Sequence, residues 1–509
     1  MALGRCLPYN HRPVPETPLA VAARTDVPVL SSRGERTPSV PVSTSRPLRL
    51  LAIAALYGFV VYVCPRPEAV SIEGWRRTGL FLSTIAGLMI QPMPGAALVI
   101  VSLTMFVLVG GLPATRVLAG YSSPSVWLVF VAMLMSRALR DSGLSRRIAL
   151  VFVRLVGHTS LGVSYALSMT DVTLAAGMSI TGRSGGIVLP VARSIAELYD
   201  SRPGATANRL GRFLMMALYQ GSAVSCAMFL TGQASNVLVA GFAAKLAGVS
   251  VTWSSWFIAA LVPGLISCVV VPLVVMKVLP PEVTRTPAAS RFAAEQLATM
   301  GTMSRHERIA AVVFTAVCLM WMTTSWHGID VAVVALGALG VLLMTNVLSW
   351  ESALREHAAW DIFVWYGGLL TLGEVLNESG STAAFAKWVG GSFGGMSWFG
   401  ALLVTIAVYY YAHYAFASVT AHALAMFQPF VVMLIGLGTP PLLAVYSLAC
   451  MANLTAGLTH YGTTTAPMVF AEGYVTLPDW WKVGLIVASA NLAIWLTVGL
   501  AWWKLLGFW

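Results

Sequence analysis

Long apolar runs recur along almost the whole chain, and they constrain its fold more than any other feature. Each run has roughly 17 to 25 residues, the length that a helix needs to cross a hydrocarbon core of about 30 Å. Of the 509 residues, 57% are hydrophobic and only 10% are charged, whereas a soluble chain carries about 25% charged residues. Helices satisfy their own backbone in lipid, so the sequence predicts an all-α polytopic membrane protein.

The formal charge of +11 does not indicate nucleic-acid binding, because the basic residues lie between the apolar runs. Basic residues in such places orient a protein in the membrane, and here they predict a cytoplasmic N-terminus in an inner (plasma) membrane. Residues 1–47 hold six arginines against three acids and predict a disordered basic tail. A transit peptide has a similar composition, so the plastid inner envelope is the alternative location.

Two pairs of short apolar segments interrupt the pattern of about eleven spans. The first pair breaks at Ser179–Gly186, and the second occupies about 397–436. Later in each half, a Gly/Thr-rich break follows, at Thr231–Asn236 and at Thr459–Thr465. Interrupted segments at matching places of two halves are the best sequence indication of a transporter binding site.

The two halves also share motifs at nearly constant spacing. The segment ending at Gly143 matches the one ending at Gly380, and Ser179-Ile180-Thr181 matches Ser418-Val419-Thr420. An odd number of spans per half would invert one copy relative to the other. Broken helices expose backbone N–H groups that must line a cavity, and helix N-termini favour anions. The sequence therefore predicts two re-entrant hairpins around an anion site at mid-membrane depth.

Three motifs resemble the divalent anion:sodium symporter family, in the branch of the bacterial citrate/succinate and tartrate/succinate exchangers and the plastid 2-oxoglutarate/malate translocators. These motifs are Thr181–Pro190, His413–His422 and Gly457–Thr463. The resemblance implies a homodimer in which a scaffold domain holds a mobile transport domain that moves as an elevator. It also implies sodium sites at the hairpin tips of the sodium-coupled members, with no other cofactor.

With this resemblance, the chain divides into six segments. After the tail (1–47) come scaffold helices with an interfacial arm (48–158), the first hairpin and broken helix (159–279), a cytoplasmic loop (280–308), a second scaffold part with its arm (309–394), and the second hairpin and broken helix (395–509).

The predicted substrate contacts come from the hairpin tips and the helix breaks. They are Ser179, Thr181, Arg183, Thr231, Gly232, Asn236, Ser418, Thr420, His422, Thr459, His460, Gly462 and Thr463. Cation sites are placed near Ser179, Gly232, Ser418 and Gly462, with sodium as the possible coupling ion. The family's motif asparagine is replaced by Ile180 and Val419, which cannot ligate a cation through a side-chain oxygen. This departure favours exchange, or a coupling ion other than sodium.

Some of these residues have a structural alternative. Arg183 either clamps a carboxylate or pairs with Asp171, and the pairing is favoured. His413 is expected to be a hydrogen-bonding core residue. For His422 and His460, a substrate contact and a structural role are equally expected. Asn453 is expected to satisfy unwound backbone, and the role of Asn236 is left open.

The predicted function is secondary active transport of di- or tricarboxylates such as malate, succinate, 2-oxoglutarate or citrate, with sulfate or another inorganic oxyanion as the alternative cargo. The sequence holds no metalloprotease, serine-hydrolase or Walker A motif, so an enzyme is not expected. A channel is disfavoured because the paired breaks suit alternating access. The six cysteines are scattered singly, without metal-ligand spacing.

Overall fold

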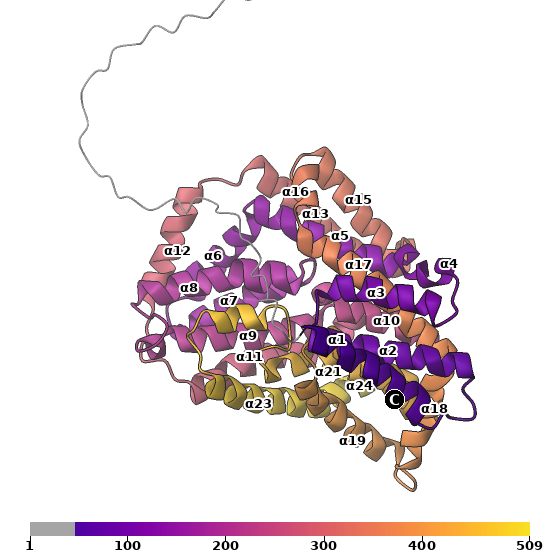
Figure 1. The fold of residues 1–509 in the computed structure, drawn as a ribbon. Coiled ribbons are helices and arrows are strands. Elements are labelled where there is room, and N and C mark those ends of the chain that lie inside the picture. The colour runs from indigo at the N-terminus through magenta and orange to yellow at the C-terminus, as the bar shows by residue number, and fades with distance from the viewer. Residues whose placement is uncertain (1–45) are drawn as a thin grey trace, which may run out of the picture. The chain divides into compact units, whose positions relative to one another are not determined.

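The computed structural model describes residues 46–509, and these residues fold entirely into helices and connecting segments (Figure 1). The only strand-like pairing among them is an isolated bridge between Thr159 and Arg285. This confirms the predicted all-α class. The predicted tail lies outside the described residues except for its last two positions, which already belong to α1.

The first half contains twelve α-helices and two π-helical segments, the first of which, Phe59–Val63, directly follows α1. The α-helices and the second π-helical segment are α1 (Arg46–Gly58), α2 (Ile72–Ile90), α3 (Gly95–Leu108), α4 (Ala114–Val117), α5 (Pro124–Asp141), α6 (Leu144–Val156), α7 (Ser160–Ala175), the π-helical Thr181–Val188, α8 (Leu189–Leu198), α9 (Gly211–Met228), α10 (Ala234–Ala247), α11 (Trp253–Val278) and α12 (Pro287–Met300).

The second half follows with α13 (Arg305–Met322), α14 (Thr324–His327), α15 (Val331–Met344), α16 (Trp350–Leu354), α17 (His357–Glu378), α18 (Ser381–Gly391), α19 (Trp398–Tyr411), α20 (Val419–Gly436), α21 (Pro441–Leu454), α22 (Ala466–Ala471), α23 (Leu477–Ile494) and α24 (Leu500–Leu505).

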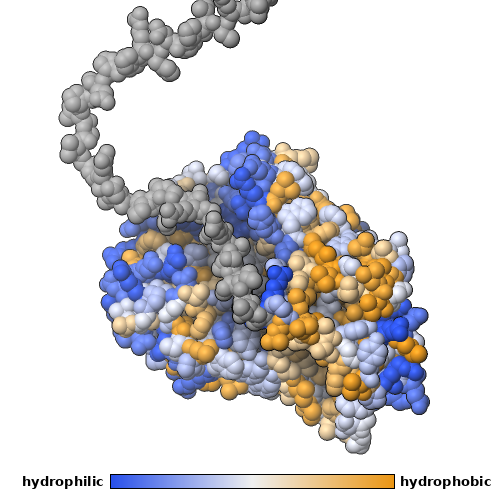
Figure 2. Space-filling view, viewed as in Figure 1, coloured by the Kyte–Doolittle hydropathy of each residue, from blue (hydrophilic) through white to orange (hydrophobic). Residues whose placement is uncertain are grey.

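Several of these helices suit a bilayer. Within residues 46–509, four helical stretches are long and apolar enough to cross one: Trp253–Val278, Val419–Gly436, Pro441–Leu458 and Leu477–Leu505. Shorter apolar helices are α3, α10 and α15. Hydrophobic residues gather on the surface where α1, α2 and α3 lie, and hydrophilic residues gather over α8 and α12 (Figure 2).

The order of elements repeats between the halves. The helix α5 leads through Gly143 into α6, and α17 leads through Gly380 into α18. Both glycines have a positive φ, of 85° and 78° respectively, a conformation that costs a residue with a Cβ about 1–2 kcal/mol. The matched motifs noticed in the sequence therefore mark the same turn at the same place in each half.

In each interrupted pair, the start of the first helix and the end of the second lie close together. The N–H of Ser160, at the start of α7, donates to the carbonyl of Thr284 at 3.1 Å, and the N–H of Ala289 donates to the hydroxyl of Tyr199, just after α8, at 3.3 Å. In the second pair, a Cβ built on Gly438 would lie 4.0 Å from Cβ of Trp398. Each pair therefore has the shape of a hairpin, with its two ends together.

The break in the first hairpin differs from the prediction. Residues Thr181–Val188 are π-helical, so most of the predicted break at Ser179–Gly186 is helical. The chain is non-helical at residues 176–179 instead. The three glycines of this stretch suggested an open loop, but glycine also allows the close backbone approaches that a wider helix makes.

The region around the predicted interfacial arm contains an additional helix. The arm forms α6 and buries Leu144, Ala149, Leu150 and Val153 along one face. The predicted loop 280–308 forms α12, which packs on α6. At the far end of that loop, Nε of Arg147 lies 2.7 Å from Oε1 of Glu307 on α13. These contacts hold the arm beside the first hairpin.

Candidate functional site

The two hairpin tips and the two helix breaks meet at one cavity of about 230 Å³. Its polar wall is built mainly from hydroxyl side chains of both halves. The predicted residues that line it are Ser179, Thr181, Thr231, Ser418, Thr420 and Thr463, joined by Thr464 and Gln233. Side chains of α5 and α17 complete the wall. The structure thus brings together six residues that lie far apart in the sequence.

The two tip serines have matching roles in their hairpins. The hydroxyl of Ser179 accepts from the N–H of Gly182 at 3.3 Å, and the hydroxyl of Ser418 accepts from the N–H of Thr420 at 3.2 Å. The N–H of Ser179 in turn donates to Ser136 on α5 at 2.9 Å. Each serine therefore caps the helix that follows it, which fixes the tip at the cavity.

The tips also contact the break of the second half. The hydroxyl oxygens of Thr181 and Thr464 lie 2.9 Å apart, and the N–H of Val419 donates to the carbonyl of Gly462 at 3.1 Å. One break therefore touches both hairpins. A displacement of this break would change the cavity from both sides.

Helix N-termini supply the positive partial charge at the site. Ser418 and Val419 at the start of α20, and Gln233 and Ala234 at the start of α10, all line the cavity. The side chain of Gln233 makes no capping hydrogen bond to α10. In α10 the N–H groups of the first turn can therefore donate to an anion, whereas in α20 the N–H groups of Val419 and Thr420 already donate to Gly462 and Ser418.

Asp361 is a cavity residue that the sequence analysis missed. It lies in the first turns of α17 and is the only ionisable side chain among the described residues that line the cavity. The signal was present in the sequence, because an acid within an apolar stretch of a membrane protein indicates a functional site. The matched motifs of the two halves predict only the hairpin tips and the helix breaks, and Asp361 belongs to none of these motifs.

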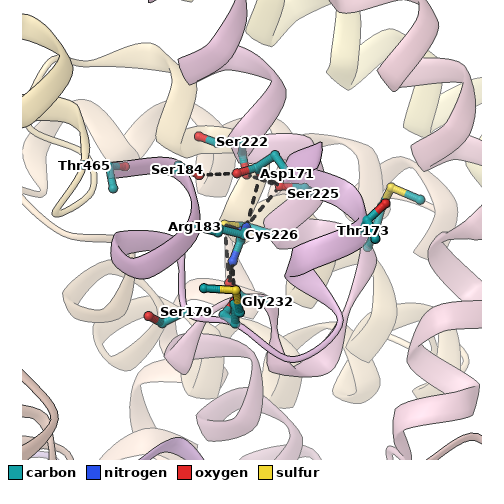
Figure 3. A network of polar contacts seen from close by, with 12 residues as sticks. Asp171, Thr173, Ser179, Arg183, Ser184, Ser222, Ser225, Cys226, Gly232 and Thr465 are labelled. Carbon is teal, nitrogen blue, oxygen red and sulfur yellow. Dashed lines mark hydrogen bonds and ion pairs between the residues drawn. The ribbon is translucent and has the colours of Figure 1, made fainter. Parts of the chain in front are cut away.

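Arg183 does not line the cavity. It is fully buried behind the first hairpin tip, where its five N–H groups all have acceptors within the protein (Figure 3). Nε donates to Asp171 at 3.2 Å, and Nη1 donates to the carbonyls of Met178 at 2.7 Å and Gly232 at 2.9 Å. Nη2 donates to Ser225 and Cys226. The geometry favours the pairing with Asp171 over a carboxylate clamp.

The carboxylate of Asp171 likewise accepts several hydrogen bonds within the protein. Besides Arg183, it accepts from the hydroxyls of Ser184 and Ser225 (Figure 3). The network joins α7, the π-helical segment, α9 and the first helix break. A buried charge pair with all its hydrogen bonds made holds these pieces in a fixed arrangement.

Asn236 and Asn453 act on the unwound backbone and on each other. The amide of Asn236 donates to the carbonyl of Cys226, in the last turn of α9, and to that of Phe229, which also accepts from the N–H of Gly232. The amide of Asn453 donates to Oδ1 of Asn236 at 2.7 Å. The backbone role expected for Asn453 is therefore performed by Asn236, and Asn453 links it to α21.

The remaining predicted contacts lie outside the cavity wall. The Nε2 of His422 lies 2.9 Å from the carbonyl of Tyr409, and the buried hydroxyl of Thr459 has no partner among the described residues. His413 is fully buried, as expected of a core residue, but the hydrogen bonds expected of it are not made, because neither ring nitrogen has a partner among the described residues. His460 is partly exposed, and its Nδ1 lies 3.4 Å from the indole nitrogen of Trp481.

Two carbonyls near the predicted cation sites already accept hydrogen bonds. The carbonyl of Gly232 accepts from Arg183, and that of Gly462 accepts from Val419. Ile180 and Val419 line the cavity with apolar side chains. Within residues 46–509, no group of three or more His, Cys, Asp or Glu side chains is placed to hold a metal ion. The coupling ion therefore remains a prediction.

A family model described as the sodium:sulfate symporter transmembrane region matches residues 45–509. The chain belongs to the divalent anion:sodium symporter family. This confirms the resemblance seen in the three motifs. Because this family consists of membrane transporters, the chain is a membrane protein of a transporter family.

Named relatives match nearly the whole length of this chain. YflS of Bacillus subtilis (strain 168) is 39% identical over 461 residues, covering 90% of this chain and 96% of YflS. The chloroplastic dicarboxylate transporter 1 of Spinacia oleracea is 39% identical, covering 91% of this chain and 82% of the relative. The inner membrane protein YbhI of Escherichia coli (strain K12) is 31% identical, with coverages of 90% and 97%.

Proposed function

We propose that this symporter-family member is a secondary active transporter that moves dicarboxylates through the cavity between its hairpin tips. The observation that carries the proposal is the symmetry of the site. Each half contributes one hairpin tip with a capping serine and a threonine, and both tips face the same cavity. A substrate with a carboxylate at each end matches a site with one set of donors from each half.

The relatives support the same class of cargo. The spinach relative is named a dicarboxylate transporter, and the name of YflS gives malate as its substrate to be tested. Malate, succinate and 2-oxoglutarate are therefore the substrates to test first, with citrate as a larger candidate. The family description favours sulfate as the alternative substrate. Sulfate carries its negative charge around a single central atom.

The mode of transport belongs to the proposal as well. Ile180 and Val419 remove two side-chain oxygens from the tips, and the carbonyls of Gly232 and Gly462 are already hydrogen-bonded. Both features favour obligate exchange over sodium symport. The homodimer, the elevator motion, the inner-membrane location and the cytoplasmic N-terminus accompany the proposal as expectations from the family and from the charge pattern.

Counterflow in proteoliposomes tests the cargo and the mode together. Vesicles are preloaded with succinate, malate, 2-oxoglutarate, citrate or sulfate, and the uptake of labelled succinate is followed with and without sodium. We expect uptake that requires an internal dicarboxylate and is indifferent to sodium. Sodium-driven uptake into empty vesicles would replace exchange with symport. Labelled sulfate uptake without any succinate uptake would contradict the dicarboxylate assignment.

A further inference from the structure

A second pocket, of about 320 Å³, lies outside the cavity, between the arm and the first hairpin. Its walls come from three parts of the chain: the end of α5 with α6, the second helix of the first hairpin, and α12. Two arginines, Arg140 and Arg146, line it together with the hydroxyl residues Ser145 and Ser194. Neither the proposed transport site nor the cation prediction uses these residues.

Both arginines keep hydrogen-bond donors that the protein does not use. Nη2 of Arg140 donates to Glu356 at 2.7 Å, but its Nε is buried and has no partner among the described residues. Arg146 is exposed, donates to Gln296 at 2.9 Å and takes part in none of the ion pairs found within residues 46–509. A buried donor without a partner costs about 1–3 kcal/mol, which a bound acceptor would recover.

The balance of charge around the pocket is positive. Glu356 is the acid that pairs with Arg140, and it also lies 3.4 Å from Arg137. Arg137 is paired in turn with Asp141. Arg146 adds a charge that no acid neutralises among the described residues. The pocket therefore favours an anion over a cation or a neutral ligand.

The hairpin is shaped to leave room for Arg140. A Cβ built on Gly186 would lie 3.3 Å from both Cδ and Nη1 of Arg140. Glycine at this position allows the guanidinium to lie against the hairpin backbone. Beyond it, Ile187, Val191 and Phe292 form an apolar wall, and a wall that excludes water strengthens a charge-assisted hydrogen bond.

The pocket and the cavity share two walls. On α5, Met133 lines the cavity and Arg140 lines the pocket, seven residues further on. Seven residues are two helical turns on the same face, about 10 Å along the axis. On the hairpin, Thr181 lines the cavity and Gly186 lines the pocket. The pocket therefore lies about two helical turns away from the cavity, along the contact between α5 and the first hairpin.

We propose that this pocket is a second anion site, in which Arg140 and Arg146 bind an oxyanion. A carboxylate approaching the cavity and the phosphate of an anionic lipid share this chemistry, because guanidinium groups bind both through paired N–H donors. An anion bound here contacts the arm, α12 and the first hairpin at once. It would therefore stabilise the present arrangement of these three parts.

The test uses the full-length protein purified in detergent, with two probes. Short-chain phosphatidylglycerol is titrated by native mass spectrometry, and the number of bound succinate molecules is measured by equilibrium dialysis. Arg146→Gln removes the unpaired charge, and Ser194→Trp fills the pocket without changing any charge. Arg154→Gln is the matched control, because it removes an exposed arginine eight residues along the same helix that does not line the pocket.

We expect both pocket variants to weaken the binding of one probe by about tenfold, the loss of roughly one charge-assisted hydrogen bond, with Arg154→Gln unchanged. A loss confined to phosphatidylglycerol assigns a lipid phosphate, and the loss of one bound succinate assigns a carboxylate. Equal binding of both probes by all four proteins, or an equal loss in Arg154→Gln, would overturn the proposal. The phosphatidylglycerol titration does not depend on whether the cavity transports dicarboxylates.

Discussion

Asp361 is the cavity residue whose charge opposes the proposed substrate. Its carboxylate faces a site that offers hydroxyls and helix N-termini to an anion. Like charges in a site with little water repel each other, so this acid weakens the binding of a dianion.

Asp361→Asn should therefore bind divalent succinate more tightly. We expect the KM for succinate in counterflow to fall about threefold to tenfold, because a repulsive charge is removed at nearly constant shape. The matched control is Asp200→Asn, an exposed acid with a φ of 50° that asparagine tolerates. A KM that stays the same or rises in Asp361→Asn would show that this carboxylate does not repel the substrate.

The buried pair of Arg183 and Asp171 makes a second prediction at this scale. Arg183→Met should lower the free energy of unfolding by about 3–5 kcal/mol, because it leaves Asp171 buried without its charge partner. Adding Asp171→Leu should recover a large part of the loss. Thermal unfolding in detergent measures both. If the double variant is less stable than Arg183→Met alone, the pair is not the source of the effect.

The sequence predicted the hydroxyl lining of the cavity better than the roles of its neighbours. Ser179, Thr181, Ser418 and Thr420 were found because the repeat places them in matching motifs. Asn236 and Arg183 lie close by in sequence, but they point to the backbone and to Asp171. Such orientations depend on which carbonyls a helix break leaves free, and a one-dimensional pattern does not contain that information.

At the scale of elements, each arm is joined to its preceding helix by a glycine with positive φ. Gly143→Ala should lower the melting temperature, because alanine at a φ of 85° costs about 1–2 kcal/mol. Gly241→Ala, in the interior of α10, is the control, and it should raise the melting temperature. Its Cβ meets nothing within 4 Å, and alanine favours a helix over glycine by about 0.8–1 kcal/mol. Equal shifts in the two variants would contradict this account.

Most long helices were predictable from apolar runs, but the short helices α4, α14 and α16, the helix α12 and the π-helical Thr181–Val188 were not. The helix α12 lies in a stretch too polar for a span, so it was predicted as a loop, yet it buries Ala289 and Ala293 between neighbouring helices. The π-helical Thr181–Val188 was predicted as a break because of its glycines. The Ala-rich sequence of α12 itself favours a helix, although one too polar to span a membrane, whereas the residue pattern of Thr181–Val188 does not distinguish a π-helix from a break.

At the scale of the whole molecule, two matched halves build one site between them. The sequence revealed the repeat through Gly143 and Gly380 and through the two Ser-x-Thr motifs. It did not reveal that the break at 459–465 contacts both hairpins, because contacts between distant segments follow from how the halves pack. The central claim is that hydroxyls from both hairpins hold the two ends of a dicarboxylate.

The most direct test removes one hydroxyl from each hairpin tip. Thr181→Val with Thr420→Val keeps the shape of the cavity and should reduce kcat/KM for succinate counterflow by about a hundredfold or more, the loss of two hydrogen bonds to charged groups. The matched control is Thr173→Val with Thr497→Val, two exposed threonines that bond only to carbonyls of their own helices. A folded tip variant that exchanges succinate at the rate of this control would contradict the account.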